Sequence, residues 1–249
     1  MHTIVVITDI HGNYPALEAV LREIDDKHPH IDHIYCLGDM IAIGPNTNEV
    51  LETLFSRENV SMILGNHEEA VMALIKKEQY PYIQEKSHHQ WIADQLRPEF
   101  IPKLLQLPRT IMCEFENQNL LFTHFHIKPE KLNVPISENP YTSTSNQYPV
   151  PMNEVKKIFQ DTTYVDAVLF GHLHESYHFQ FNQTVFVSPE ALGCNHQSFA
   201  RYVLLEIEGE SIRVSLKPIS YDKEAFIRSF KQTNVPDQEN ILRIFYGEK

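Results

Sequence analysis

The chain has 249 residues, and 42% of them are apolar, which is enough for a packed core and excludes a largely disordered chain. Its 33 acidic residues outnumber its 21 basic ones, and the formal net charge of −12 argues against a basic face for a nucleic-acid backbone. The three cysteines form no C-x-x-C pair, no apolar run approaches the ~18 residues of a membrane span, and no secretory leader is expected. We therefore expect a cytoplasmic protein that contacts neither membranes nor long nucleic acids.

The first 65 residues alternate between predicted strands and helices. Strands are predicted at 3–8, 31–37 and 60–64, where short apolar runs occur. Helices are predicted at 14–26 and 48–55, because apolar residues recur there every three or four positions. This order implies right-handed crossovers and a parallel sheet.

The rest of the chain is less regular, and no composition break marks a second domain, so one domain spanning 1–249 is expected. A helical insertion is expected near 77–108 and closing helices at 221–246. A Pro-rich loop with five prolines is expected near 127–151, and loops of that length are often functional. The other predicted elements are helices at 69–77 and, in pieces, 90–107, strands at 109–115 and 119–123, a helix at 152–160, a strand at 165–170, and consecutive strands from 177 to 216.

Several predicted strands end in side chains of the types that bind metal ions. Because the carboxyl ends of parallel strands meet at one edge of a sheet, these distant segments are expected to converge. Alternate residues of an extended segment point the same way, so Asp9 would lie beside His11, and His172 beside His174. The segments are Asp9-Ile10-His11-Gly12, Gly38-Asp39, Gly65-Asn66-His67-Glu68, His124 after the 119–123 strand, and Gly171-His172-Leu173-His174.

Glycine placement and donor chemistry both favour a metal centre. Sharp turns and close backbone approach need glycine, and four of the eight glycines lie directly beside a candidate ligand: Gly12, Gly38, Gly65 and Gly171. The candidate set combines carboxylates, one carboxamide and several imidazoles without a thiolate, which fits Mn, Fe or Zn better than Mg or Ca. Seven ligating side chains are too many for one ion and suit two ions that share a carboxylate.

These residues resemble the motifs of the calcineurin-like metallophosphoesterases, D-x-H, G-D, G-N-H-[DE], H and G-H-x-H, which occur here in that order over residues 3–197. The resemblance implies an α/β fold, a four-layer α-β-β-α sandwich, with the strand-rich stretch 177–216 in its second sheet. It implies a first metal held by Asp9, His11 and His174, a second held by Asn66, His124 and His172, and Asp39 as the bridge. His67 would meet the phosphate and protonate the leaving group, held by Glu68.

Three segments depart from the family pattern. Residues 40–45 replace the D-R-G of its protein phosphatases, which makes that branch less favoured. His124 and His126 both lie where one middle ligand is expected, and His124 is preferred because it follows the strand directly. Residues 188–193 replace the common N-P-G-S, so substrate choice is expected to differ.

The resemblance implies two divalent transition-metal ions (Mn, Fe or Zn) and attack by a metal-bridging hydroxide. Such a centre would carry a net charge of about +1 within an acidic protein and attract a phosphate. A small nucleotide such as diadenosine tetraphosphate is the first-choice substrate. The alternatives are a phosphodiesterase or phosphomonoesterase of another substrate, including a phosphoprotein phosphatase, and a non-catalytic scaffold on the same fold. Weaker candidates for substrate contact are His196 and Arg201 for phosphate, Trp91 for a base, and Tyr141 and Tyr148 in the Pro-rich loop.

Overall fold

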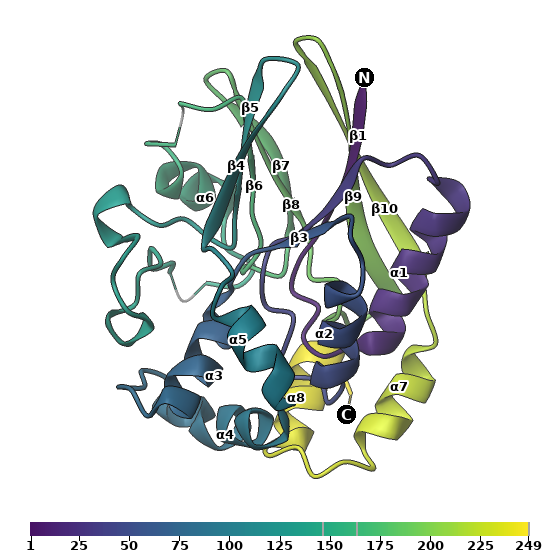
Figure 1. Cartoon of the computed structure of the whole chain (residues 1–249), viewed down its shortest axis with the longest axis vertical. Helices are drawn as coiled ribbons and strands as arrows, with labels where there is room; N and C mark the ends of the chain where they lie inside the picture. Colours follow the sequence, from purple (N-terminus) through teal and green to yellow (C-terminus); the bar gives the residue numbers. More distant parts are fainter. Residues whose placement is uncertain (146, 163, 249) are drawn as a thin grey trace.

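Two five-stranded sheets form the centre of the computed structural model, which describes residues 1–145, 147–162 and 164–248 (Figure 1). The first sheet has the order β10-β9-β1-β2-β3. Its strands are β1 (His2–Ile7), β2 (His33–Cys36), β3 (Val60–Met62), β9 (Phe199–Glu208) and β10 (Ser211–Ser220). The second has the order β4-β5-β6-β8-β7, with β4 (Thr110–Phe115), β5 (Gln118–Thr123), β6 (Ala167–Leu169), β7 (Ser176–Phe181) and β8 (Thr184–Pro189). The parallel pairing of β1, β2 and β3 confirms the crossovers expected for the first 65 residues.

Helices flank both sheets. The N-terminal and C-terminal helices pack on the first sheet: α1 (Tyr14–Lys27), α2 (Thr47–Phe55), α7 (Lys223–Phe230) and α8 (Gln238–Tyr246). The chain between β3 and β4 forms α3 (Asn66–Lys76), α4 (Lys86–Gln95) and α5 (Ile101–Leu104). Helix α6 (Met152–Ile158) covers the second sheet. Asn13 shows how local sequence starts one of these helices, because its side chain accepts a hydrogen bond from the Ala16 backbone N–H at 3.2 Å and caps α1.

Alternation along the strands produces three apolar layers. In β1, Val5 and Ile7 belong to the cluster with the outer helices, whereas Ile4 and Val6 belong to the cluster between the sheets. The second sheet does the same, since Leu120 and Phe122 of β5 face the first sheet while Leu121 faces α6. Successive strand residues point to opposite faces, so each sheet must be covered twice. The four-layer α-β-β-α sandwich expected from the sequence is therefore confirmed.

The expectation that the whole stretch 177–216 lies in the second sheet is wrong. Strands β7 and β8 do lie there, but β9 and β10 belong to the first sheet, where β9 pairs antiparallel with β1. The alternation of β9 explains this placement, because Tyr202 and Leu204 pack with the helices while Val203 and Leu205 pack between the sheets. A strand buried on both faces needs a central position, and residues 190–198 carry the chain across to it.

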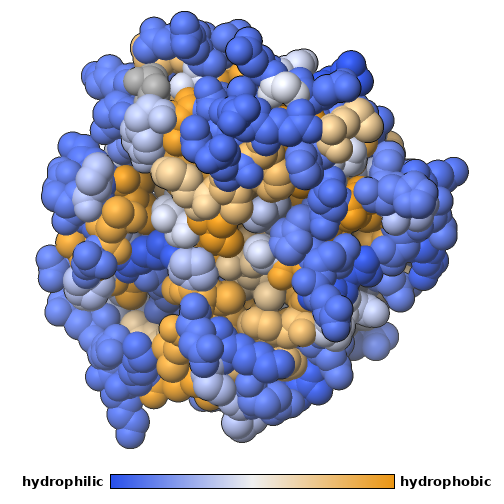
Figure 2. All heavy atoms as spheres, turned by 45° about the horizontal axis from the view of Figure 1, so that its top comes forward, coloured by the Kyte–Doolittle hydropathy of each residue, from blue (hydrophilic) through white to orange (hydrophobic). Residues whose placement is uncertain are grey.

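The ends of the β4–β5 and β9–β10 hairpins lie at the opposite end of the sheets from the motif loops. There the Met1 amino group donates to Glu116, whose carboxylate also accepts the Gly209 N–H at 2.5 Å. Seen from this end, the surface is mostly hydrophilic around its rim, with hydrophobic side chains gathered toward the middle (Figure 2). None of the helices in the described ranges has the length and apolarity needed to cross a bilayer.

Candidate metal centre

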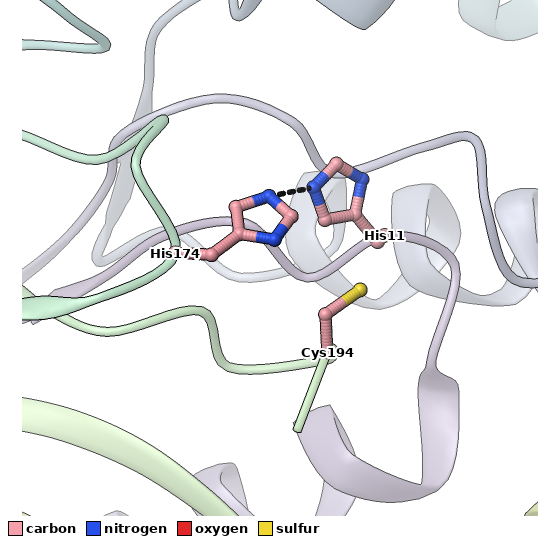
Figure 3. A group of neighbouring side chains, drawn as sticks. All are labelled: His11, His174 and Cys194. Carbon is pink, nitrogen blue, oxygen red and sulfur yellow. Dashed lines mark hydrogen bonds between the residues drawn. The ribbon is translucent and has the colours of Figure 1, made fainter. Parts of the chain in front are cut away.

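The first group of motif residues meets at the carboxyl end of β1. The Nε2 atoms of His11 and His174 point at one another and are 2.9 Å apart (Figure 3). Asp9 Oδ1 lies 3.8 Å from His11 Nε2 and 3.6 Å from His174 Nε2. Three side chains that can ligate a metal ion, from segments 163 residues apart, thus surround one possible ion position.

The second group lies beside the first. Asn66 Oδ1 is 3.0 Å from His124 Nε2 and 2.9 Å from His172 Nδ1, and these two ring nitrogens are 3.2 Å apart. Asp39 joins the groups, because its Oδ2 lies 3.8 Å from His11 Nε2 and 3.3 Å from His124 Nε2. The structure brings together all seven residues expected as ligands.

Backbone carbonyls orient two of the imidazoles. His11 Nδ1 donates to the Ile41 carbonyl at 3.3 Å, and His124 Nδ1 donates to the Leu37 carbonyl at 2.8 Å. A proton held on Nδ1 leaves the Nε2 lone pair of each ring directed at the centre, as for histidines that bind metal ions.

Several of these residues have a left-handed backbone, which is costly for side chains other than glycine. Five of the seven expected ligands have a positive φ between 48° and 72°: Asp9, His11, Asp39, His172 and His174. Strain of this kind persists only where the surrounding structure imposes it and gathers at functional sites.

Two glycines allow the backbone to approach the carboxylates. A Cβ on Gly65 would lie 2.8 Å from Asp39 Cγ, and a Cβ on Gly171 would lie 2.6 Å from Asp9 Oδ2. Both distances are shorter than any real Cβ contact, so these positions require glycine, as their place beside the motif residues predicted.

The electrostatics suit a cation at this point. Burial lowers the pKa of His11 and of His172 to about 3, so both rings are neutral and able to ligate at neutral pH. Burial alone would raise the pKa of Asp39, but the neighbouring His124, with His67 and His11, holds it well below its usual range. Burial alone would likewise lower the pKa of His124, but Asp39 raises it to about 9. A buried carboxylate here attracts positive charge, which a proton on His124 or a metal ion in its place can supply.

The donor set fits divalent transition metals. Ligand atoms about 2.0–2.2 Å from one ion are separated by roughly 3–3.6 Å in tetrahedral or octahedral geometry. The separations in the first group, 2.9 and 3.6 Å, and in the second, 3.0 and 3.2 Å, are close to this range. Carboxylate oxygen, carboxamide oxygen and imidazole nitrogen are the ligand types of Mn, Fe and Zn sites.

Glu68 does not hold His67, contrary to the expectation. Its carboxylate, fully buried in the first turn of α3, accepts backbone N–H groups from Asp39, Met40 and Gly65 at 2.7–2.8 Å and from Ile41 at 3.1 Å. It therefore fixes the turn that carries Asp39. The partner of His67 is His89, whose Nε2 lies 2.7 Å from His67 Nδ1. Burial lowers the pKa of His67 well below its usual range, so the ring is neutral at pH 7.

Other candidates lie outside the two groups. His126 Nδ1 is 2.7 Å from Thr142 Oγ1 and its Nε2 is 2.8 Å from Asp161 Oδ1, away from the centre, which favours His124 as the middle histidine. His196 Nε2 donates to the Ile244 carbonyl at 2.8 Å, and Arg201 pairs with Glu190. The partners of His196 and Arg201 in these interactions are not among the seven expected ligands.

Cys194 also lies beside the first group, although no sequence motif points to it. Its thiol lies with His11 and His174, and the potential ligand atoms of all three are within 4.8 Å of one another (Figure 3). Burial raises the pKa of this thiol well above its usual range. A lone cysteine in a loop carries no pattern that predicts such a neighbourhood.

Two adjoining cavities open over the centre. One, of about 560 Å³, is lined by Asp39, Asn66, His67, His172 and His174 and by the aromatic rings of Tyr82, Tyr141, Tyr148 and Phe245. The other, of about 540 Å³, shares Tyr148, His174 and Phe245 with it and adds Glu175, Glu190, Cys194 and His196. The Pro-rich loop and the segment before α4 both contribute walls, whereas Trp91 packs against the core cluster of the helices.

Comparison with known proteins places these observations in a family context. Residues 2–176 match the family model described as calcineurin-like phosphoesterase. An uncharacterized protein of Methanocaldococcus jannaschii is 31% identical over 173 residues, 69% of this chain and 62% of that protein. A protein of Erwinia tasmaniensis named bis(5'-nucleosyl)-tetraphosphatase, symmetrical, is 29% identical over 128 residues, 50% of this chain and 44% of that protein. The chain thus spans about half the length of such curated relatives.

The fold also matches solved structures. The structure of a hypothetical protein from Pyrococcus horikoshii superposes with a TM-score of 0.78 at 20% identity and covers 100% of both chains. At this identity the likeness concerns the fold.

Proposed function

The chain belongs to the calcineurin-like phosphoesterase family, and we propose that it hydrolyses a small phosphorylated substrate with two divalent transition-metal ions. Asp9, His11 and His174 would hold the first ion, Asn66, His124 and His172 the second, and Asp39 would bridge them. The observation that carries the proposal is the position of Asp39, whose Oδ2 lies within 3.8 Å of a histidine from each group.

Bound ions of this kind supply Lewis-acid chemistry, in which water is activated and charge on the phosphoryl group is neutralised. The chain's own contribution is orientation and hydrogen bonding. His67 lines the larger cavity, and its Nε2 lies 3.9 Å from Asp39 Oδ2, on the side of the ring that faces the centre. As a neutral ring, it would donate a hydrogen bond to the leaving oxygen, where negative charge develops.

A nucleotide such as diadenosine tetraphosphate remains the first-choice substrate. The cavities are walled by aromatic rings suited to stacking on bases, and among their described lining residues there is no Lys or Arg to hold a long polyanion. The pair of cavities meeting at His174 would accommodate a substrate with a nucleoside at each end. The name of the Erwinia tasmaniensis relative supports the same choice.

Metal analysis and a substrate panel test the proposal together. We expect two equivalents of transition metal per chain, and Mn- or Fe-dependent hydrolysis within a panel of mononucleotides, cyclic nucleotides, dinucleoside polyphosphates and phosphoproteins. Dialysis against EDTA should abolish turnover, and added metal should restore it. Protein that binds no metal would instead favour a scaffold on this fold, and turnover that survives exhaustive chelation would refute metal-dependent hydrolysis.

The substrate panel also separates the alternatives within the class. Preference for a dinucleoside polyphosphate over phosphodiesters, phosphomonoesters and phosphoproteins would support the first choice. The reverse preference would assign the chain to another substrate while leaving the metal chemistry in place. We propose that all of this resides in one cytosolic domain spanning 1–249, in which Cys36, Cys113 and Cys194 are free thiols suited to a reducing compartment.

A further inference from the structure

We propose that His89 and Tyr80 are positioning residues that keep the proton of His67 on Nε2, the nitrogen that faces the metal centre. The inference rests on the proposed function and extends it, because neither residue belongs to the family motifs described above. Both come from residues 77–108, the segment expected as a helical insertion.

A hydrogen-bonded chain leads from His67 away from the centre. His67 Nδ1 lies 2.7 Å from His89 Nε2, and the other ring nitrogen of His89, Nδ1, bonds the hydroxyl of Tyr80. His89 lies in α4 and is fully buried, and Tyr80 is half-buried. Both ring nitrogens of His89 therefore have hydrogen-bond partners, and His67 Nδ1 is paired with His89.

The chain can run in two directions. Either Tyr80 donates to His89, which donates to His67 and leaves the His67 proton on Nε2, or every bond is reversed and His67 Nε2 is bare. Burial lowers the pKa of His89 to about 3, so this ring is neutral and carries a single N–H whose position its neighbours decide. Burial also raises the pKa of Tyr80, which therefore keeps its proton to donate.

The carboxylate of Glu85 favours the first direction. Its Oε2 lies 3.7 Å from His89 Nε2, where it stabilises an N–H and would repel a bare lone pair. With the His89 proton on Nε2, His89 donates to His67 Nδ1 and accepts from the hydroxyl of Tyr80 at Nδ1. His67 then carries its own proton on Nε2 and presents an N–H to the leaving oxygen.

Leaving-group dependence tests the role in turnover. The pair of substrates is the phenyl and 4-nitrophenyl esters of whichever class, phosphomonoester or phosphodiester, the wild-type protein hydrolyses. Removing one donor to developing negative charge costs roughly 10²–10³-fold in kcat. We expect a loss of that order for His89→Ala on the phenyl ester, a smaller one for Tyr80→Phe, and little loss on the 4-nitrophenyl ester, whose leaving oxygen needs little help.

Matched controls separate positioning from folding. KM and metal content should stay at wild-type values in both variants, and His89→Gln, whose amide can still donate to His67 Nδ1, should recover part of kcat. His33→Ala and Tyr164→Phe remove the same groups at residues that line neither cavity over the centre, and both variants should keep the wild-type kcat on both esters. Equal losses on both esters, or loss of metal from His89→Ala, would overturn the positioning role.

A second measurement needs no turnover. In zinc-loaded protein with ¹⁵N-labelled histidine, long-range ¹H–¹⁵N correlation should show His67 as the Nε2–H tautomer, and His89→Ala should show a mixture. A wild-type Nδ1–H tautomer would overturn the inference. If the wild-type protein hydrolyses no phosphoester with any metal, the proposed function fails, whereas this spectrum still decides the hydrogen-bond chain.

Discussion

Glu68 Oε2 accepts a hydrogen bond at 2.8 Å from the backbone N–H of Asp39, although 29 residues separate them. The same carboxylate also accepts from Gly65, Met40 and Ile41. The first turn of α3 therefore fixes the backbone that follows β2 and carries Asp39, and Glu68 acts on the candidate centre through that backbone.

We expect Glu68→Gln to destabilise the protein and weaken metal binding. The amide NH₂ would face backbone N–H groups, and each buried donor left without a partner costs roughly 1–3 kcal/mol. Urea unfolding and metal analysis measure the two effects, and the exposed Glu78→Gln serves as the control. Normal stability with reduced turnover would instead support the role first expected for Glu68, at His67.

Metal stoichiometry can distinguish the proposed bridging residue from the proposed ligands of one ion. We expect Asp39→Asn to reduce the bound metal below one equivalent, because Asp39 approaches histidines of both groups. His172→Ala should lose only the second ion, since its ring contacts Asn66 and His124. Elemental analysis of purified protein measures both. His126→Ala, outside the centre, should keep two ions, and an Asp39→Asn protein that also keeps two would contradict the bridge.

The sequence predicts the parts of this molecule that depend on local pattern. Apolar runs located β1, β2 and β3, and glycines beside polar side chains located the strand ends that converge. The rule that parallel strands gather ligands at their carboxyl ends predicts the convergence of Asp9 and Asp39, which follow β1 and β2 of one sheet. His174 follows β6 of the other sheet, so its approach to Asp9 depends on how the two sheets pack. The left-handed backbone of Asp9 and His174 had no signal in the sequence.

Features that depend on contacts between distant segments could not be predicted. The pairing of β9 with β1 joins opposite ends of the chain. The two buried faces of β9 suit a central position, but β8 is buried in the same way, so this pattern does not say which sheet each strand joins. His67 meets His89 because α3 packs against α4, and the position of Cys194 depends on where residues 190–198 cross between the sheets. In each case packing in three dimensions, rather than a sequence pattern, determines the neighbour.

His124 makes the metal-free protein sensitive to pH. Its folded pKa of about 9 lies above the ordinary value of 6.5, so its stabilising contribution is complete below pH 6.5 and is lost as pH rises through 9. The lowered pKa values of His11 and His172, and the pKa of about 7 to which burial raises Glu68, act at or below pH 7. We therefore expect the free energy of unfolding of the metal-free chain to fall between pH 7 and 9.

Calorimetry and unfolding at several pH values check this. The fall should be clearly smaller in His124→Gln than in His126→Gln. A small fall should remain, because the pKa values of the Met1 amino group and of the Cys36 and Cys194 thiols are also raised. Zinc binding at pH 7.5, measured in buffers of different ionisation enthalpy, should release about one proton from His124 because the ion replaces it. A metal-free protein whose stability is flat over this range would show that His124 is neutral.

Gly171 sets the position of Asp9, and we expect Gly171→Ala to remove the first ion. Its Cβ would overlap Thr8 Oγ1, which donates to Asp9 Oδ2 at 2.7 Å, and would lie 2.6 Å from Asp9 Oδ2 itself. Both groups are buried and must shift, at a cost of roughly 1–3 kcal/mol. Gly209→Ala is the control, because its Cβ would enter open space and its φ of +57° costs only about 1–2 kcal/mol. Metal titration should show weakened binding in the first variant alone, and wild-type affinity in Gly171→Ala would mean that the loop carrying Asp9 can move without losing the site.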